Sequence, residues 1–226
     1  MANFPTHLVG AAVGSSVAAS IFAQVHAVSA PRALLLISIG TVGGLLPDID
    51  SDHSVPARWV RGAIATAIGV MAVSSLWITH APAVALALGC CAGIGGYMVV
   101  EHVVNRWTVH RGIVHSIPFG LLCVFLMAIA THRLLLLPAV EAWWMASFLG
   151  AGFLIHLSLD EIASVDITSA RVKRSFGTAL KLWDRSVVKT IAVYALLFVA
   201  FSAVPSFVDF VSQARALFLA MSAWVA

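Results

Sequence analysis

The sequence predicts an all-α protein that crosses a membrane several times, as a bundle of about seven spans plus a C-terminal amphipathic helix. Of the 226 residues, 61% are hydrophobic and only 10% are charged, and the mean hydropathy is +0.98. That composition leaves too little polar surface for a soluble globule of this length. The long apolar stretches are rich in Ala, Gly, Leu and Val, which favours packed helices over the short alternating strands of a membrane barrel.

The spans follow from the length of these apolar stretches, since a helix needs about 20 apolar residues to cross the hydrocarbon core. We predict spans near residues 8–29, 33–47, 62–80, 82–104, 114–131, 141–159 and 187–205. The second is short and contains Gly40, Gly43 and Gly44, so we expect it to be tilted or to stop part-way across. We expect residues 1–226 to form a single membrane-embedded domain.

The stretch 206–226 is predicted to be an interfacial amphipathic helix rather than an eighth span. Apolar residues recur there at helical spacing, at Phe207, Phe210, Val211, Ala214, Leu217 and Met221, opposite Asp209, Ser212, Gln213 and Arg215. At the other end of the chain, the first residues lack the basic segment of a signal peptide, so we expect them to be retained. Retention matters because His7 is a candidate metal ligand.

The basic residues predict how the spans are oriented. Alternate loops of such a bundle face the same side, which groups the N-terminus with the loops near 48–61, 105–113 and 160–186. Ten of the 13 basic residues belong to that side: Arg58, Arg61, Arg106, Arg111, Arg171, Lys173, Arg174, Lys181, Arg185 and Lys189. By the positive-inside rule that side is cytoplasmic, and we expect a multi-pass protein of the bacterial inner membrane.

The histidines divide between the two sides in the same way. Six of the nine, His7, His53, His102, His110, His115 and His156, fall at the cytoplasmic ends, whereas His26, His80 and His132 fall at the opposite ends. The carboxylates Asp48, Asp50, Asp52, Glu101, Asp160, Glu161 and Asp166 accompany the first group. Imidazole and carboxylate are the ligands of hydrolytic zinc sites, and ionisable groups beside hydrocarbon are costly without partners. This segregation predicts a membrane-embedded metal-dependent enzyme.

Two short motifs point most directly to metal ligation. His156 and Asp160 lie four residues apart at the end of an apolar run, so a helix places them on one face, one turn apart. A polar helix end that contacts lipid headgroups would have the same pattern. The second motif places His110 and His115 on either side of a glycine that permits a sharp reversal, after which Ser116 can cap a new helix.

Four further residues are candidates for the chemistry of the site. Arg111 lies between the two histidines of the second motif, where it suits an anion clamp or a positive-inside anchor equally well. Asp48 and Asp50 follow Pro47 and can direct two carboxylates to one ion, or one to the ion and one to a ligating histidine. Glu101 needs a partner at the end of its apolar segment, which would be Asn105 or a neighbouring helix, or alternatively a metal.

These elements together resemble the YdjM-like bacterial inner-membrane metal-dependent hydrolases, which are distantly similar to the zinc-dependent phospholipase C superfamily. The matching segments are Thr6-His7, Leu45-Leu46-Pro47-Asp48-Ile49-Asp50 with Ser54, His110-Arg111-Gly112 through His115-Ser116, and Ile155-His156 through Asp160. The resemblance implies that His7, Asp48, His110, His115, His156 and Asp160 are metal ligands. It also implies a hydrolytic reaction and more than one zinc ion.

The function expected from these observations is hydrolysis of a lipid-borne ester, in particular a phosphoester, at the cytoplasmic face. A divalent metal, zinc or alternatively manganese, would activate water and stabilise the developing charge. Asp50 or Glu101 would act as general base and Arg111 as the anion clamp. The expected partners are a membrane lipid substrate and the bilayer itself, with no nucleic acid.

Two other classes of function fit parts of the sequence. A transporter would use the histidines and acids as an ion path, but transport sites lie near the midplane of the membrane, whereas these residues gather at one face. A structural membrane protein stabilised by a metal would bind zinc and hydrolyse nothing. Metal analysis combined with a lipid hydrolysis assay separates these alternatives.

Overall fold

The computed structural model describes residues 3–26, 28–50, 55–107, 112–166, 171–172, 177 and 180–225. The helices are α1 (Phe4–Val25), α2 (Ala30–Gly43), the 3-10 helix η1 (Leu46–Asp50), α3 (Val55–Leu76), α4 (Pro82–Trp107), α5 (Ile117–Leu134), α6 (Ala139–Ile162), α7 (Val187–Ala203) and α8 (Val208–Val225). Strands in the described part of the chain are limited to β1 (Val165–Asp166) and β2 (Arg171–Val172), which pair antiparallel. The prediction of an all-α membrane protein is confirmed.

The number of spans differs somewhat from the predicted seven. In the described residues, five segments are long and apolar enough to cross a membrane: α1, Ala30–Asp48, Pro82–His102 of α4, α5 and α6. A sixth is added if α7 and α8, which meet at a bend of 98°, are counted as one broken span. The predicted third span is shorter because the apolar part of α3 covers only Arg61–Leu76. The predicted seventh, α7, has 17 residues and ends shortly before Pro205.

Helix α6 forms the centre of the bundle. It packs against α1, α2, α5 and α8, and 61% of its apolar window is buried. One hydrophobic cluster joins Leu149, Phe153 and Leu157 of α6 to Leu46 and Val114 from neighbouring segments. Because Leu149, Phe153 and Leu157 recur every four positions, they lie on one face of α6, and neighbouring segments cover that face.

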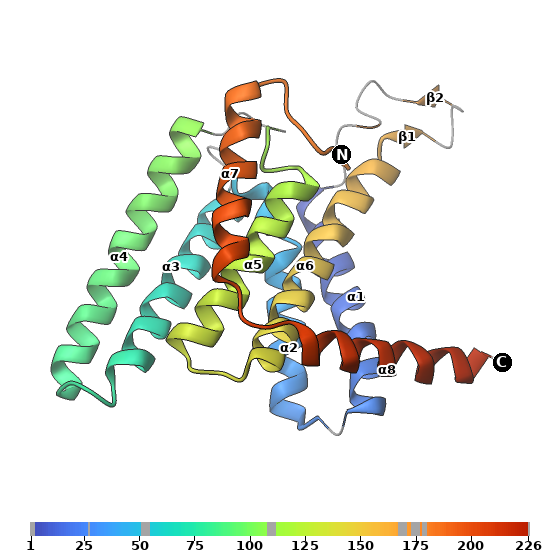
Figure 1. The fold of residues 1–226 in the computed structure, drawn as a ribbon. Helices are drawn as coiled ribbons and strands as arrows, with labels where there is room; N and C mark the ends of the chain where they lie inside the picture. Colours follow the sequence, from blue (N-terminus) through green and yellow to red (C-terminus); the bar gives the residue numbers. More distant parts are fainter. Residues whose placement is uncertain are drawn as a thin grey trace.

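Helices α3 and α4 form a hairpin at one side of the bundle (Figure 1). They pack mainly against each other, with Gly69, Gly89 and Gly93 at their contact. The hairpin joins the rest of the molecule through η1 and, more weakly, through α5. Ile64 and Val100 are the residues of the hairpin that pack against the central hydrophobic cluster.

Helix α8 turns away from α7 and runs across the bundle, as Figure 1 shows. Phe210 packs between the indole rings of Trp143 and Trp144, with ring centroids 5.9 Å and 4.9 Å away. Trp144 Nε1 donates a hydrogen bond to Gln213 Oε1 at 3.0 Å. The C-terminal helix predicted for residues 206–226 is therefore present and is fixed to α6 by aromatic contacts.

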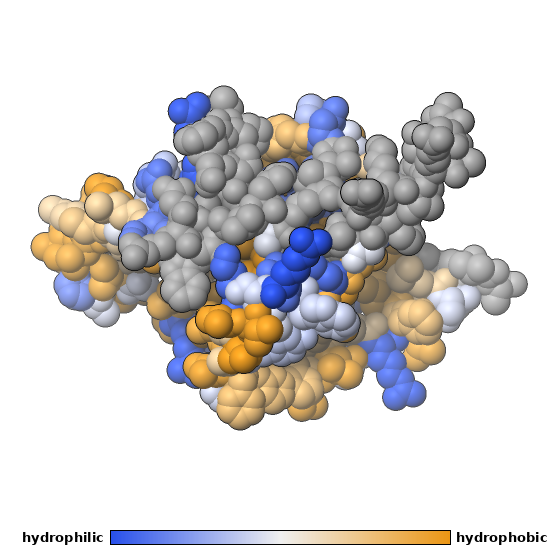
Figure 2. Space-filling view, turned by 90° about the horizontal axis from the view of Figure 1, so that it is seen from above, coloured by the Kyte–Doolittle hydropathy of each residue, from blue (hydrophilic) through white to orange (hydrophobic). Residues whose placement is uncertain are grey.

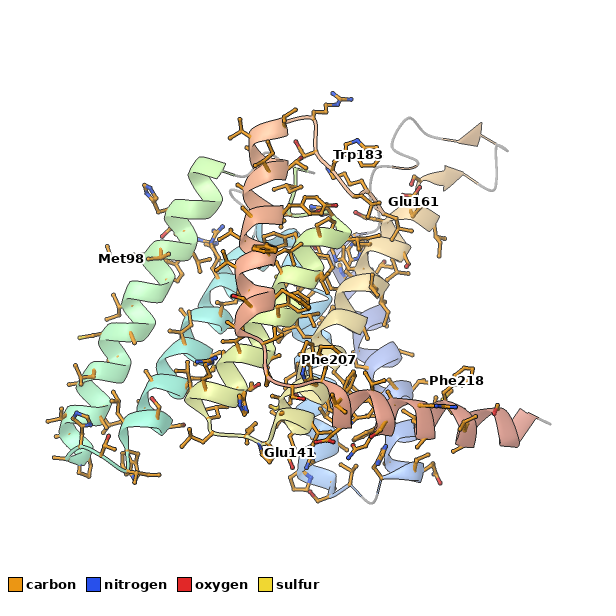
Figure 3. The ribbon with its side chains drawn as sticks, viewed as in Figure 1. Met98, Glu141, Glu161, Trp183, Phe207 and Phe218 are labelled. Atoms are coloured by element: carbon orange, nitrogen blue, oxygen red, sulfur yellow. The ribbon has the colours of Figure 1, made fainter. Side chains whose placement is uncertain are left out.

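The ends of the helices that carry the candidate ligands all lie at one end of the bundle. The start of α1, η1, the start of α5 and the end of α6 meet at the upper end in Figure 1. Trp183 and Glu161 are labelled near this upper end in Figure 3, whereas Glu141 lies toward the opposite end. Seen from above in Figure 2, hydrophilic side chains lie toward the middle of this face and hydrophobic ones along much of its rim.

Candidate metal centre

The first turn of α1 carries His7. Asn3 is the N-cap of this helix, and its Oδ1 accepts hydrogen bonds from Thr6 N at 3.1 Å and from Thr6 Oγ1 at 2.6 Å. Asparagine is among the best N-cap residues because its side chain replaces a missing backbone partner. The cap fixes the start of the helix, and His7 follows directly, buried with 1% of its surface exposed.

The turn before α5 carries His115. Its backbone N donates to Gly112 O at 3.1 Å, which closes the turn. Ser116 is the N-cap of α5, and its Oγ accepts a hydrogen bond from Phe119 N at 3.4 Å. The prediction that Ser116 begins a new helix is confirmed. His115 lies just outside that helix and is 1% exposed.

The last turns of α6 carry His156 and Asp160. They lie one turn apart on the same face of the helix, and their exposed fractions are 0% and 2%. Their packing explains this burial, because Leu157 and Phe153 of the same helix belong to the central hydrophobic cluster. The helix therefore presents an imidazole and a carboxylate to the interior of the bundle.

The segment η1 carries Asp48. The backbone N of Asp48 donates to Leu45 O at 3.2 Å, so the chain turns immediately after α2 ends. Leu46 and Pro47 are buried, whereas the Asp48 side chain is 18% exposed. Asp48 is thus the most exposed of the candidate ligands that the structure describes.

These side chains form two overlapping groups of potential metal donors. The first contains His7, His156 and Asp160, and the second contains Asp48, His115 and His156. Within each group, one donor atom from each residue lies within 4.8 Å of the others. His7 Nε2 is 3.3 Å from Asp160 Oδ1, and His156 Nε2 is 3.8 Å from Asp48 Oδ1. The rings of His7 and His156 stack with centroids 3.6 Å apart.

His156 is shared by both groups, and its hydrogen bonding determines what it can bind. Its Nδ1 is 2.7 Å from the carbonyl oxygen of Gly44. A carbonyl oxygen only accepts hydrogen bonds, so Nδ1 carries the proton. The neutral ring then has its lone pair at Nε2, on the side of Asp48. Because one lone pair can bind only one ion, an ion held by either donor group would occupy the same position beside Nε2 of His156.

The donor atoms fit a divalent metal. Zinc with ligands at about 2.0–2.1 Å in a tetrahedral arrangement has neighbouring donors about 3.3 Å apart, which is the distance between His7 Nε2 and Asp160 Oδ1. His7 Nδ1 and His156 Nε2 are buried and have no hydrogen-bond partner among the described residues. Buried polar atoms normally have such a partner. An ion coordinated by Nε2 of His156 would satisfy one of these two atoms.

The structure brings five of the six predicted metal ligands together. The sixth, His110, lies outside the described residues, as does Arg111, and the side chain of Asp50 is likewise not described. Glu101 lies in α4, half-buried, and His102 beside it is exposed. In the described part of the chain, neither joins a donor group. His26, His80 and His132 lie at the opposite ends of α1, α3 and α5.

One feature of the site and one buried charge elsewhere in the bundle were not predicted from the sequence. Gly44 supplies a backbone carbonyl to His156, and backbone groups leave no pattern of residue types. Arg61, which was expected only to be among the basic residues of the cytoplasmic side, is 2% exposed. The spacing from Ile64 could have predicted the burial of Arg61, because residues three apart share one face of a helix and Ile64 packs against the central cluster.

The extended segment that precedes α7 in the chain, which includes Lys181 and Asp184, contacts the start of α5 near the site. Ile117 N, two residues after His115, donates to Lys181 O at 3.0 Å. Burial raises the pKa of Asp184, but the hydrogen bond from Ser186 N and the ammonium of Lys181 outweigh that effect. The pKa of Asp184 therefore lies below its usual value, and the carboxylate stays charged.

A family model described as YdjM inner membrane protein matches residues 1–211. The chain belongs to this family. The match confirms the resemblance to the YdjM-like inner-membrane family, whose description assigns it to the inner membrane, and hydrolase activity stays a prediction. No curated protein and no solved structure is significantly similar to the chain. The distant similarity to the phospholipase C superfamily and the orientation of the site toward the cytoplasm stay predictions.

Proposed function

We propose that this protein is a metal-dependent hydrolase that cleaves a lipid-borne ester, in particular a phosphoester, at the cytoplasmic face of the inner membrane. The main support is the cluster of His7, Asp48, His115, His156 and Asp160, which four separate segments bring to one end of a membrane bundle. Ionisable side chains are costly inside a membrane protein and are therefore kept chiefly for function.

In this proposal the clustered histidines and carboxylates hold the ion. Three imidazoles and two carboxylates form a donor set that suits zinc, with manganese as the alternative. Such an ion would supply Lewis acidity, which activates water near neutral pH and polarises the phosphoryl or carbonyl oxygen of an ester. His110 would complete the ligand set, as the family resemblance implies.

Other residues of the chain would position the substrate and move the proton. Asp50 or Glu101 would accept the proton of the attacking water, and Arg111 would hold the anionic oxygen of the ester. The buried guanidinium of Arg61 adds positive charge on the helix that follows η1. These roles follow from the chemistry of the side chains and from their positions in the chain.

The burial pattern suggests how a substrate approaches. His7, His115, His156 and Asp160 are 0–2% exposed, while the Asp48 side chain is 18% exposed. The accessible side of the cluster is therefore that of η1, at the end of the bundle. A lipid whose tails stay in the bilayer would bring its headgroup to this level.

The proposal is tested with purified protein in detergent or nanodiscs. Metal content is measured first, and bacterial lipids incubated with the protein are then compared by mass spectrometry. We expect stoichiometric zinc or manganese and loss of a phospholipid or another lipid ester, and we expect neither result with His156→Ala. Stoichiometric metal without turnover of any lipid would favour a metal-stabilised structural protein. Protein that carries no metal and hydrolyses nothing would contradict the proposal.

A further inference from the structure

Helices α2 and α6 meet along a seam of glycines, which we define as Gly40, Gly43 and Gly44 on the side of α2 and Gly152 on α6. A methyl group added at Gly152 would collide with the backbone of Gly40 and come within 2.9 Å of Gly44 N. One added at Gly43 would collide with the backbone of Leu149. Helix backbones come this close in membranes where residues are small. The glycine seam therefore sets the distance between α2 and α6.

This distance determines whether His156 can reach α2. His156 lies one turn beyond Gly152, on the same face of α6. Gly44 is the C-cap of α2, where carbonyl groups lack donors from within the helix. His156 supplies such a donor, since its Nδ1 is 2.7 Å from Gly44 O and the contact is buried. If α2 were moved outward by one methyl group, this hydrogen bond would be lost.

We propose that the glycine seam is a positioning device for the candidate metal centre. It holds the Gly44 carbonyl against Nδ1–H of His156 and thereby fixes Nε2 as the nitrogen that faces the ion. Metal-bound histidines commonly donate their second N–H to a carbonyl or carboxylate, which fixes both the tautomer and the ring orientation. Here the acceptor is a backbone atom, and its place depends on the absence of side chains at the seam. The inference rests on the proposed metal centre.

The alternative tautomer would be unsuitable for metal binding. Without the Gly44 carbonyl, the proton of the neutral imidazole distributes over both nitrogens. A proton on Nε2 blocks the atom that lies 3.8 Å from Asp48 Oδ1, in the one residue that both donor groups share. The seam therefore affects metal affinity through His156, without any contact between its glycines and the ion.

The first measurement needs neither metal nor activity. Nitrogen NMR of metal-free protein labelled with [15N]histidine distinguishes the two neutral tautomers, and the His156 signals are assigned by their loss in His156→Gln. We expect wild-type His156 to carry its proton on Nδ1. A proton on Nε2 in the metal-free wild-type protein would overturn the inference. This measurement is independent of whether the protein proves to be a hydrolase.

The second measurement compares two matched variants on α6. In Gly152→Ala the added methyl group meets backbone atoms of α2, whereas in Gly150→Ala it meets only Val124 Cγ2, the end of a side chain. Both substitutions favour the helix equally. We expect Gly152→Ala to shift the His156 tautomer and to weaken zinc binding about 10- to 100-fold, as loss of an orienting partner does. We expect Gly150→Ala to match the wild type in both respects.

A third variant guards against a general loss of folding. In Gly43→Ala the added methyl group on α2 would clash with the backbone of Leu149 on α6, so this variant should give the same tautomer shift. If either seam variant is folded and keeps both the wild-type tautomer and the wild-type zinc affinity, the positioning role is wrong. If wild-type protein binds neither zinc nor manganese, the proposed metal centre fails, while the tautomer comparison still decides whether the seam orients His156.

Discussion

At the scale of residues, the candidate centre depends on side chains that hydrophobic packing holds in place. His7 and His156 stack at 3.6 Å because α1 and α6 pack side by side. Asp160 lies 3.3 Å from His7 and extends the cluster toward the end of α6. Each side chain is already oriented before any ion binds, so little conformational entropy is lost on binding.

We predict that His7→Ala, His156→Ala and Asp160→Asn each reduce zinc affinity by more than about 100-fold, because each removes a direct ligand and disturbs its neighbours. Metal content after dialysis against a weak chelator measures the effect. His80→Ala serves as the control, since His80 is exposed at the opposite end of α3. Equal metal content in all four variants would contradict the ligand assignment.

The sequence allowed us to predict which residues belong to the cluster, but it did not allow us to predict how most of them are arranged. The spacing of His156 and Asp160 was sufficient, because a helix determines the relation between residues four apart. The position of His7 beside them depends on how α1 packs on α6, which no local pattern encodes. The role of Gly44 was not predictable, because it uses a backbone carbonyl placed by helix packing.

At the scale of elements, the N-terminus of α7 is held by a small polar network. Asp184 Oδ1 accepts a hydrogen bond from Ser186 N at 2.9 Å, and Lys181 Nζ lies 3.3 Å from Asp184 Oδ2. Ser186 caps the helix and accepts from Lys189 N at 3.4 Å. This network fixes the extended segment that contacts the start of α5.

We predict that Asp184→Asn destabilises the start of α7 by about 1 kcal/mol near neutral pH, because a charged hydrogen-bond acceptor is lost. The folded-state pKa of Asp184 lies below the ordinary value of about 3.9, so its contribution is complete above that value and is lost as pH falls through the folded-state pKa. Hydrogen exchange of the first turn of α7 should therefore differ between variant and wild type near pH 7. A difference that persisted unchanged near pH 2 would contradict this role.

Helix α8 depends on aromatic packing against α6. We predict that Phe210→Ala loosens α8 by about 2–3 kcal/mol, because the ring that lies between Trp143 and Trp144 is removed. Limited proteolysis between α7 and α8 reports this loosening. Phe218→Ala is the matched control, since that ring is 69% exposed, and cleavage at equal rates in the two variants would argue against the packing.

Apolar length predicted most elements, and the exceptions have identifiable causes. Helix α3 ends at Leu76, so the stretch that was predicted to span the membrane up to residue 80 is shorter. The bend between α7 and α8 lies at a break near Pro205. A hydropathy pattern can indicate such a break, but it does not predict the angle between the two helices. Composition sets which segments are helical, whereas tertiary packing sets where they end.

At the scale of the whole molecule, the helices place the candidate centre at one end of the bundle. The positive-inside rule predicts that this end faces the cytoplasm, because ten of the 13 basic residues belong to that side. The family match supports the inner membrane as the location. The orientation is open to direct measurement.

We predict that a membrane-impermeant maleimide added to intact cells with a permeable outer membrane labels Ile78→Cys and leaves Trp183→Cys unlabelled until the inner membrane is opened. Both positions are exposed, at 85% and 68%. Ile78 follows the end of α3 at Leu76, whereas Trp183 is labelled near the opposite, upper end of the bundle in Figure 3. The variants are made in a background with Cys90, Cys91 and Cys123 changed to alanine. The reverse labelling pattern would place the candidate centre in the periplasm.

The α3–α4 hairpin contacts the rest of the bundle mainly through η1, so the position of η1 affects the whole hairpin. The same short helix carries Asp48. An ion bound by Asp48 would tether η1 to α6, and by thermodynamic linkage it would restrain the hairpin as well. We expect zinc to slow hydrogen exchange in α3 and α4 in the wild type and to have no such effect in Asp48→Asn. The hairpin would then report, from a distance, whether the centre is filled.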